Sequence, residues 1–311
     1  MKNFLQKIYT ERFRWYDEFF IVGLISLILV IFGENIGLMI GRLLKNVVGW
    51  TSPFGTTFTL YFVSIGVWII MILHMRIFAH RRPILNAIGS KPEGNTVKHL
   101  LIGLLIGFGT NIFCALVAMI HRDIHVSFDN FNPLYFLLLL FAVFVQSSSE
   151  ELVERAFYFQ TLKKGYRSKW VAIIGNSLAF CLMHAGNNGV NNLALLGIFF
   201  SGIMFSLAVY YFDSLWMAFG MHTGWNFTQS ILLGLPNSGK VVPYSIFKLD
   251  TANAVNSFAY DINFGIESSI VAVLVQALVC LLLWYFGKKR NKEPIDVYAD
   301  YDFKKIRQTN L

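Results

Sequence analysis

Cysteine and charge are both scarce in this 311-residue sequence. Only three cysteines occur, with no Cys-x-x-Cys pair, which argues against a disulfide-stapled secreted domain and against a zinc ribbon. Charged residues make up 14% of the chain, whereas soluble domains carry roughly 25%. Because hydrophobic residues make up 55%, the composition indicates a polytopic integral membrane protein rather than a soluble globular one.

Long apolar runs fill most of the sequence. A membrane-spanning helix needs about 20 mostly apolar residues, and eight segments approach that length. The expected spans are Phe19–Leu43, Thr56–Phe78, Leu100–Ile120, Pro133–Leu162, Trp170–Ala185, Leu193–Phe212, Ser214–Leu235 and Ser268–Phe286. We therefore predict an all-α protein in which residues 1–287 form a single multi-pass membrane domain. Residues 288–311 are polar, and we expect a cytoplasmic helix or a loose tail there.

The basic residues follow the order of these runs. The net charge is +8, and Lys and Arg cluster in the second loop (76–98), the fourth loop (163–169) and the tail (288–292). Cytoplasmic segments of membrane proteins carry such an excess, so we expect a cell-membrane protein with both termini in the cytoplasm. Topology thus explains the positive charge, and no nucleic-acid partner is expected. The lipid bilayer is the expected surrounding, and the oligomeric state is left open.

Two adjacent glutamates, Glu150 and Glu151, lie inside the apolar run Phe136–Gln160. A carboxylate at membrane depth is costly: insertion scales give a free-energy cost of about 2.5 kcal/mol or more. Arg155 follows Glu151 by four residues, so the two side chains can pair along one helix. Packing gives no reason for such a cluster, and an ionisable group within a membrane span indicates a functional site.

Two further spans carry polar residues that fit the same depth. His184 ends the fifth apolar run, and His222 and Asn226 lie four residues apart in the seventh, on one helix face. With a rise of about 1.5 Å per residue, Glu150, His184 and His222 lie roughly 20, 21 and 14 Å from the cytoplasmic ends of their spans. Distant segments therefore place polar groups at comparable depth, and we expect one catalytic cavity between helices four to seven.

These residue types suit hydrolysis by an activated water. A glutamate can act as general base when its neighbours tune its pKa, and two adjacent carboxylates separate in pKa because both cannot easily be charged in low dielectric. Histidine and asparagine donors can stabilise an oxyanion. Alternatively, Glu150, His184 and His222 can bind zinc with a position left open for water. The residue types leave both chemistries open.

Three motifs in this order make the chain similar to a known family. It resembles the CPBP family, also called the Abi or CAAX amino-terminal protease family of intramembrane endopeptidases, over about Val143 to Gln229. The matching motifs are Glu150-Glu151-Leu-Val-Glu-Arg155, Phe180-Cys-Leu-Met-His184 and His222-Thr-Gly-Trp-Asn226. A further segment, Phe264-Gly265-Ile266-Glu267-Ser268, is loosely similar to a Gly/Glu segment common near the last helix of that family.

The resemblance implies a role for each motif residue. Glu150 and His184 activate the water, Glu151 and Arg155 organise them, and His222 and Asn226 hold the oxyanion. The implied substrate is a membrane-associated peptide or protein. Eukaryotic members process prenylated CAAX proteins, and bacterial members act in peptide processing, bacteriocin maturation and self-immunity. Because the family is often labelled as metalloproteases, zinc is the implied cofactor if there is one.

Other protease classes and other functions are distinguished by sequence or by experiment. The chain has no Gly-x-Ser-Gly, Gly-x-Gly-Asp or His-Glu-x-x-His, which argues against rhomboid-like, presenilin-type and site-2-type chemistry. Two alternatives are a non-catalytic scaffold or immunity protein with the same fold and a proton-coupled transporter. If the chain is a scaffold, Glu150→Gln is expected to leave the biological phenotype intact, and if it is a protease the phenotype is expected to be lost. A transporter is expected to show a proton-coupled flux that the other two lack. Glu34, in the first span, has no partner that the sequence identifies.

Overall fold

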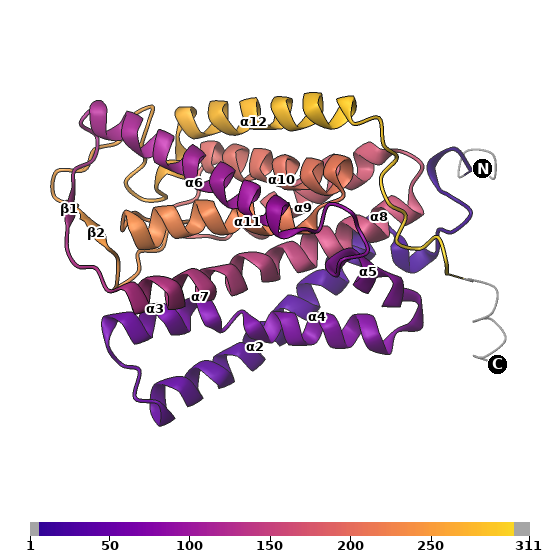
Figure 1. Ribbon diagram of the computed structural model, residues 1–311, viewed down its shortest axis with the longest axis horizontal. Helices are drawn as coiled ribbons and strands as arrows, with labels where there is room; N and C mark the ends of the chain where they lie inside the picture. Colours follow the sequence, from indigo (N-terminus) through magenta and orange to yellow (C-terminus); the bar gives the residue numbers. More distant parts are fainter. Residues whose placement is uncertain (1–5, 302–311) are drawn as a thin grey trace.

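The computed structural model describes residues 6–301, and helices dominate that part of the chain (Figure 1). The α-helices are α2 (Phe19–Val47), α3 (Pro53–Phe62), α4 (Ile65–Ile77), α5 (Leu85–Ile88), α6 (Val97–Ile120), α7 (Pro133–Glu151), α8 (Phe159–Gly165), α9 (Asn176–Met183), α10 (Asn192–Phe212), α11 (Leu215–Asn226) and α12 (Ile270–Lys289). Strands β1 (Val126–Phe128) and β2 (Phe247–Leu249) pair antiparallel, with Val126 opposite Leu249.

Shorter helical turns link these elements. Three are 3₁₀ turns: η1 (Trp15–Asp17), η2 (Ala79–Ile84) and η6 (Ile266–Ser268). Three are π-helical: η3 (Leu152–Tyr158), η4 (Val171–Gly175) and η5 (Phe227–Leu232). Each π-helical segment continues directly into an α-helix or out of one, so α7, η3 and α8 form a single long rod.

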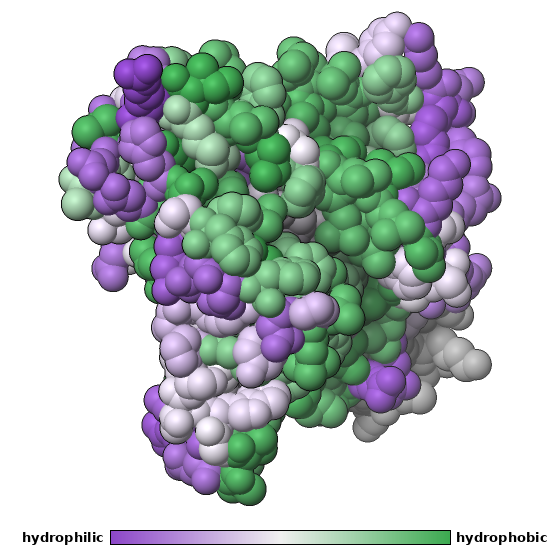
Figure 2. All heavy atoms as spheres, turned by 60° about the vertical axis from the view of Figure 1, so that its left-hand side comes forward, coloured by the Kyte–Doolittle hydropathy of each residue, from purple (hydrophilic) through white to green (hydrophobic). Residues whose placement is uncertain are grey.

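Six helices of the described residues are long and apolar enough to cross a membrane. They are Phe19–Val47, Pro53–Ile77, Val97–Ile120, Pro133–Gly165, Asn192–Phe212 and Ile270–Lys289. The fifth and seventh expected spans fall on shorter helices, Val171–Met183 and α11. Figure 2 shows a broad hydrophobic band between hydrophilic surfaces at the two ends of the molecule. The chain is therefore a helical multi-pass membrane protein, and the count of eight spans stays a prediction.

Helices α6 and α11 cross so closely that side chains are excluded from their contact. A Cβ on Gly107 of α6 would lie 2.0 Å from the carbonyl oxygen of Met221, and a Cβ on Gly220 of α11 would lie 2.3 Å from that of Leu100. Small residues let membrane helices approach each other in this way, and van der Waals packing then drives their association. The crossing holds α11 rigidly against α6.

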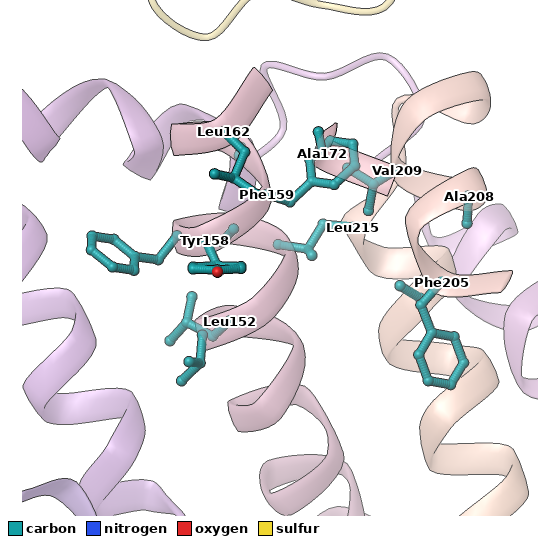
Figure 3. Close-up of a cluster of buried hydrophobic side chains, with 14 of the residues drawn as sticks. Leu152, Tyr158, Phe159, Leu162, Ala172, Phe205, Ala208, Val209 and Leu215 are labelled. Carbon is teal, nitrogen blue, oxygen red and sulfur yellow. The ribbon is translucent and has the colours of Figure 1, made fainter. Parts of the chain in front are cut away.

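One large apolar cluster lies between the α7–η3–α8 rod and helix α10 (Figure 3). Leu152 and Phe159 from the rod pack with Phe205 and Val209 from α10 and with Leu215 from α11. These side chains are almost completely buried. Burial of an apolar side chain against its neighbours gains dispersion contacts whatever the surrounding solvent, so this cluster fixes the rod relative to α10 and α11.

Buried charges tie the N-terminal segment to the bundle. The Oδ1 atom of Asp17 lies 3.0 Å from Nη1 of Arg81, and its Oδ2 atom lies 2.6 Å from Nζ of Lys164. All three side chains are buried. A buried charge is tolerated only when it is paired, so this cluster joins η1, η2 and α8 at one end of the molecule.

The tail that follows α12 returns to the same end. The backbone N–H of Ile295 donates to Oδ1 of Asp213 at 2.8 Å, Arg12 pairs with Asp296 at 2.7 Å, and Tyr298 is buried. Residues 290–301 contain no helix, so the expected cytoplasmic helix does not form there, and Val297 and Tyr298 are buried. The separation of the tail from the membrane domain stays a prediction. Residues 302–311 of that predicted tail lie outside the described residues.

Candidate active site

Glu150 lies near the end of α7, where three helices converge. The Nε2 atom of Gln146, one turn earlier, donates to Oε1 of Glu150. The Oε1 atom of Gln146 in turn accepts from Nδ2 of Asn226 at 3.1 Å, and the same Nδ2 atom lies 3.2 Å from Oγ of Ser147. Helices α7 and α11 are thus joined through a side-chain network that includes two of the residues singled out from the sequence.

Both histidines direct the same ring nitrogen at Glu150. The Nδ1 atom of His184 lies 2.8 Å from the carbonyl oxygen of Phe180, and Nδ1 of His222 lies 2.9 Å from Oε1 of Glu151. Since a carbonyl oxygen only accepts, Nδ1 of His184 carries a proton, and Nδ1 of His222 carries one because the Glu151 carboxylate accepts from it. The Nε2 atoms of His184 and His222 lie 3.7 and 3.9 Å from Oε2 of Glu150.

Glu151 and Arg155 form the buried ion pair that their spacing predicts. Nη1 of Arg155 lies 3.3 Å from Oε1 of Glu151, and both side chains are fully buried. Nη2 of Arg155 donates to the carbonyl oxygen of Gly202 at 3.1 Å. The guanidinium also faces the rings of Phe180 and Phe205, whose centroids lie 4.5 and 5.2 Å from Cζ. A cation between aromatic faces is stabilised by their quadrupoles, which holds Arg155 in place behind Glu151.

A small cavity of about 40 Å³ adjoins the two histidines. His184, His222 and Asn226 line it, together with apolar side chains that include Phe180 and Phe205. The ring of Phe205 stacks on that of His222, with centroids 5.1 Å apart and an interplanar angle of 16°. The histidine rings are therefore held by contacts on several sides, and both line the cavity.

The sequence of residues 132–228 matches the family model described as Type II CAAX prenyl endopeptidase Rce1-like. The matched range runs from the residue that caps α7 into η5, and it holds all the motif residues from Glu150 to Asn226. The resemblance to the CAAX protease family is confirmed. No curated protein and no solved structure matches the chain.

The CAAX protease motif residues lie together in the structure, whereas two other glutamates, Glu154 and Glu34, lie outside this group. All six predicted site residues, which are Glu150, Glu151, Arg155, His184, His222 and Asn226, lie within the connected set of contacts described above. Glu154 points elsewhere, because its Oε2 atom accepts from Nδ2 of Asn176 at 2.6 Å. Glu34, which the sequence left without a partner, is exposed on α2.

Metal binding was the second chemistry that the CAAX protease resemblance left open. Zinc takes donors about 2.0–2.2 Å from the ion, with three protein ligands in a catalytic site. Within residues 6–301, no group of three or more His, Cys, Asp or Glu side chains is arranged to hold a metal ion. Zinc binding by Glu150, His184 and His222 therefore stays a prediction, and no chemical step below passes through a metal.

Two residues at the site were not predicted from the sequence, and a third, Glu267, was named only as part of a segment with a loose family similarity. Gln146 bridges Glu150 and Asn226, and its position four residues before Glu150 was the signal that could have identified it. Phe205 is one apolar residue in an apolar helix, and nothing in the sequence distinguishes it. Glu267, in η6, lines the cavity, and its side chain is buried. Burial raises the pKa of Glu267 to about 7, although hydrogen bonds from Ser238 and Trp225 oppose the rise.

The π-helical segments also escaped prediction. η3 begins directly after Glu151, and η5 begins directly after Asn226. Such wide turns shift the register of the residues that follow them and occur frequently at functional sites. Here they change the faces presented by two helices just beyond the CAAX protease motif residues. A period of 3.6 residues read from the sequence gives no sign of them.

Proposed function

We propose that this chain is an intramembrane endopeptidase that hydrolyses a peptide bond with a water activated by Glu150 and His184. The observation that carries the proposal is the arrangement of Oε2 of Glu150 between the Nε2 atoms of His184 and His222, at 3.7 and 3.9 Å. These separations are too long for direct hydrogen bonds. They suit one water oxygen that hydrogen-bonds to all three atoms.

In the first step, the carboxylate of Glu150 takes a proton from this water, and Nε2 of His184 orients the oxygen. The water oxygen forms a bond to the carbonyl carbon of the substrate, and the carbonyl π pair moves onto the carbonyl oxygen. Preorganised donors stabilise such an oxyanion in a site with little water. We assign this role to Nε2 of His222, which donates when the ring is doubly protonated, and to Nδ2 of Asn226, which exchanges its 3.2 Å contact with Oγ of Ser147 for the oxyanion.

In the second step, the tetrahedral intermediate collapses and the carbon–nitrogen bond breaks. The protonated carboxyl of Glu150 returns its proton to the leaving nitrogen, so the products are a new carboxyl terminus and a new amine. Glu150 thus acts first as general base and then as general acid, which one positioned carboxyl group can do in successive steps. The proton balance needs no further reactant.

Glu151 and Arg155 are positioning residues in this mechanism. Oε1 of Glu151 accepts from Nδ1 of His222 and from Arg155, which orients the imidazole and balances the charge that develops when His222 is doubly protonated. A carboxylate that orients a catalytic histidine in this way acts through that histidine and does not itself transfer the proton. Arg155 keeps Glu151 ionised through their buried ion pair.

The proposed substrate is a membrane-associated peptide or protein. A site in the middle of a multi-pass protein is reached by chains that are held at the bilayer, and the Rce1-like match supports this class. CAAX-type C-terminal processing and bacterial peptide or bacteriocin processing both belong to it. We further propose a cell-membrane location with both termini in the cytoplasm, which is supported by the basic loops and by the tail that packs near η1.

The test uses purified protein in lipid vesicles with a quenched fluorescent peptide that carries a lipid anchor. The wild type is compared with Glu150→Gln and His184→Ala, and zinc is measured in each sample. Glutamate-dependent hydrolysis predicts cleavage by the wild type without stoichiometric zinc and strong loss in both variants. Cleavage by both variants at the wild-type rate overturns the site assignment, and stoichiometric zinc that disappears in His184→Ala favours the metalloprotease alternative.

A further inference from the structure

The wall of the cavity carries a second polar group besides the motif residues. Ser201 of α10, Glu267 of η6 and Gln276 of α12 line the same cavity as His222. Glu267 and Gln276 are buried, with exposed fractions of 7% and 2%. Both lie beyond residues 132–228, so the family match does not include them. Burying a polar group in a membrane protein costs free energy unless the group is hydrogen-bonded. We therefore expect these side chains to be hydrogen-bonded.

Gln276 supplies an acceptor that the protein leaves open. Its Nε2 atom donates to Oγ of Ser201 at 2.9 Å, while its Oε1 atom is buried and has no hydrogen-bond partner among the described residues. A Cβ on Gly197 would lie 3.6 Å from this oxygen and 2.6 Å from the carbonyl oxygen of Glu267. The glycine therefore leaves the space beside Oε1 of Gln276 unfilled.

Glu267 adds a carboxylate to the same wall. Its Oε1 atom accepts from Nε1 of Trp225 at 3.3 Å, and its Oε2 atom accepts from the backbone N–H of Ser238 at 2.9 Å and from its hydroxyl at 3.2 Å. A carboxyl group has about four acceptor positions, so these three hydrogen bonds leave capacity for another donor. His222 and Asn226 line the same cavity, which places this carboxylate on one wall with the motif residues.

The wall therefore presents hydrogen-bond acceptors to whatever enters the cavity. A volume of about 40 Å³ is large for one water, which needs roughly 10–15 Å³ on this measure, and small for a long side chain. A hydroxyl or carboxamide head fills such a space and supplies the donor that Oε1 of Gln276 lacks. An aliphatic head of the same size leaves that oxygen unpaired.

We propose that Gln276, Glu267 and Ser201 form a substrate subsite for a small side chain with a hydrogen-bond donor, a hydroxyl or carboxamide, next to the cleaved peptide bond. This subsite rests on the proposed function, because it assigns the substrate class of the same catalytic centre. A site built to hydrogen-bond a substrate group discriminates far more strongly against an analogue that lacks the group than a purely apolar pocket does. The subsite therefore selects threonine over valine and asparagine over leucine.

The test uses two lipid-anchored peptides in vesicles, and mass spectrometry first identifies the bond that is cleaved. The peptides differ only at a position that flanks this bond, which is Thr in one and Val in the other. The wild type is expected to cleave the Thr peptide with kcat/KM about tenfold or more above the Val peptide. Gln276→Met keeps the length of the side chain, removes the acceptor, and is expected to bring the ratio close to one. Gln276→Glu keeps an acceptor and is expected to retain the preference. Thr110→Val on α6 is the matched control, and it is expected to leave the ratio unchanged.

A binding measurement separates this inference from the proposed function. The same peptides are titrated against Glu150→Gln, which retains the cavity wall. Glu150-dependent cleavage of Thr and Val peptides at equal rates overturns the subsite and leaves the protease intact. If the wild type cleaves neither peptide but the Thr peptide binds tenfold more tightly than the Val peptide, and Gln276→Met removes this difference, the protease is overturned and the subsite is supported. A Thr preference that Gln276→Met leaves unchanged also overturns the subsite.

Discussion

Nδ1 of His222 lies 2.9 Å from Oε1 of Glu151, across the contact between α11 and α7. This hydrogen bond separates the functions of the adjacent glutamates. Glu151 is committed to His222 and Arg155, whereas Oε2 of Glu150 is left facing two imidazole nitrogens. In the mechanism proposed above, Glu150 therefore carries the proton, and Glu151 keeps Nδ1 of His222 protonated and its ring oriented.

Glu151→Gln tests the positioning role. The amide places a donor or a weaker acceptor against Nδ1 of His222 and removes the balancing charge, so kcat is expected to fall by about 10²- to 10⁴-fold. The KM for a membrane-anchored peptide is expected to stay within about threefold, because Glu151 does not contact substrate in this mechanism. A rise in KM at unchanged kcat contradicts the assignment. The measurement is steady-state kinetics in vesicles of fixed composition.

Arg155→Met tests the buried ion pair through stability. Removing one partner leaves Glu151 charged, buried and without its cation, which costs about 3–5 kcal/mol for such pairs. The melting temperature in detergent is expected to fall clearly. The double variant Glu151→Gln with Arg155→Met removes the stranded charge and is expected to regain part of the loss. Equal melting temperatures for Arg155→Met and the wild type contradict the predicted contribution of the pair.

Gly107→Ala tests whether the crossing of α6 and α11 positions the site. The added methyl would meet the carbonyl oxygen of Met221 at 2.0 Å, and overpacking of this kind costs about 1–3 kcal/mol. Because His222 follows Met221, activity and melting temperature are both expected to fall. Gly109→Ala on the same helix is the matched control, since a Cβ there meets nothing within 4 Å. Loss of activity in the control alone contradicts the account.

Cysteine labelling tests the proposed topology. Ser168 lies in the basic fourth loop, and Ala252 lies after β2, between the seventh and eighth expected spans; both are exposed. In a variant without the three native cysteines, Ser168→Cys is expected to react with an impermeant maleimide only after the cells are opened, and Ala252→Cys before. The positive-inside pattern is the physical reason. The reverse order of reactivity contradicts the orientation.

The sequence was sufficient to predict the elements that depend on local chemistry. Each expected apolar run is mostly helical, in one or more segments, and the spacing of Glu151 and Arg155 correctly predicted their ion pair. A long apolar helix in lipid satisfies its own backbone groups, so length and composition alone indicate it. The motif residues could be grouped because their depth follows from the helix rise.

Contacts between distant segments were beyond the same argument. The break between α3 and α4 occurs inside an apolar run without proline. The segment after η5 turns back along the helix, where Nε2 of Gln229 donates to the carbonyl oxygen of Pro236 at 2.6 Å. This return brings Ser238 to Glu267. Local periodicity contains no information about such returns or about π-helical turns, because both depend on tertiary packing.

The central claim is that Glu150 activates the water, and the most direct measurement compares Glu150→Gln with Glu154→Gln. Both changes replace a glutamate of the same rod by its amide, but only Glu150 faces the histidines. The account predicts that Glu150→Gln lowers kcat by at least about 10²-fold and that Glu154→Gln keeps it within about threefold. Cleavage by Glu150→Gln at the wild-type rate, in protein with unchanged melting temperature, would contradict it.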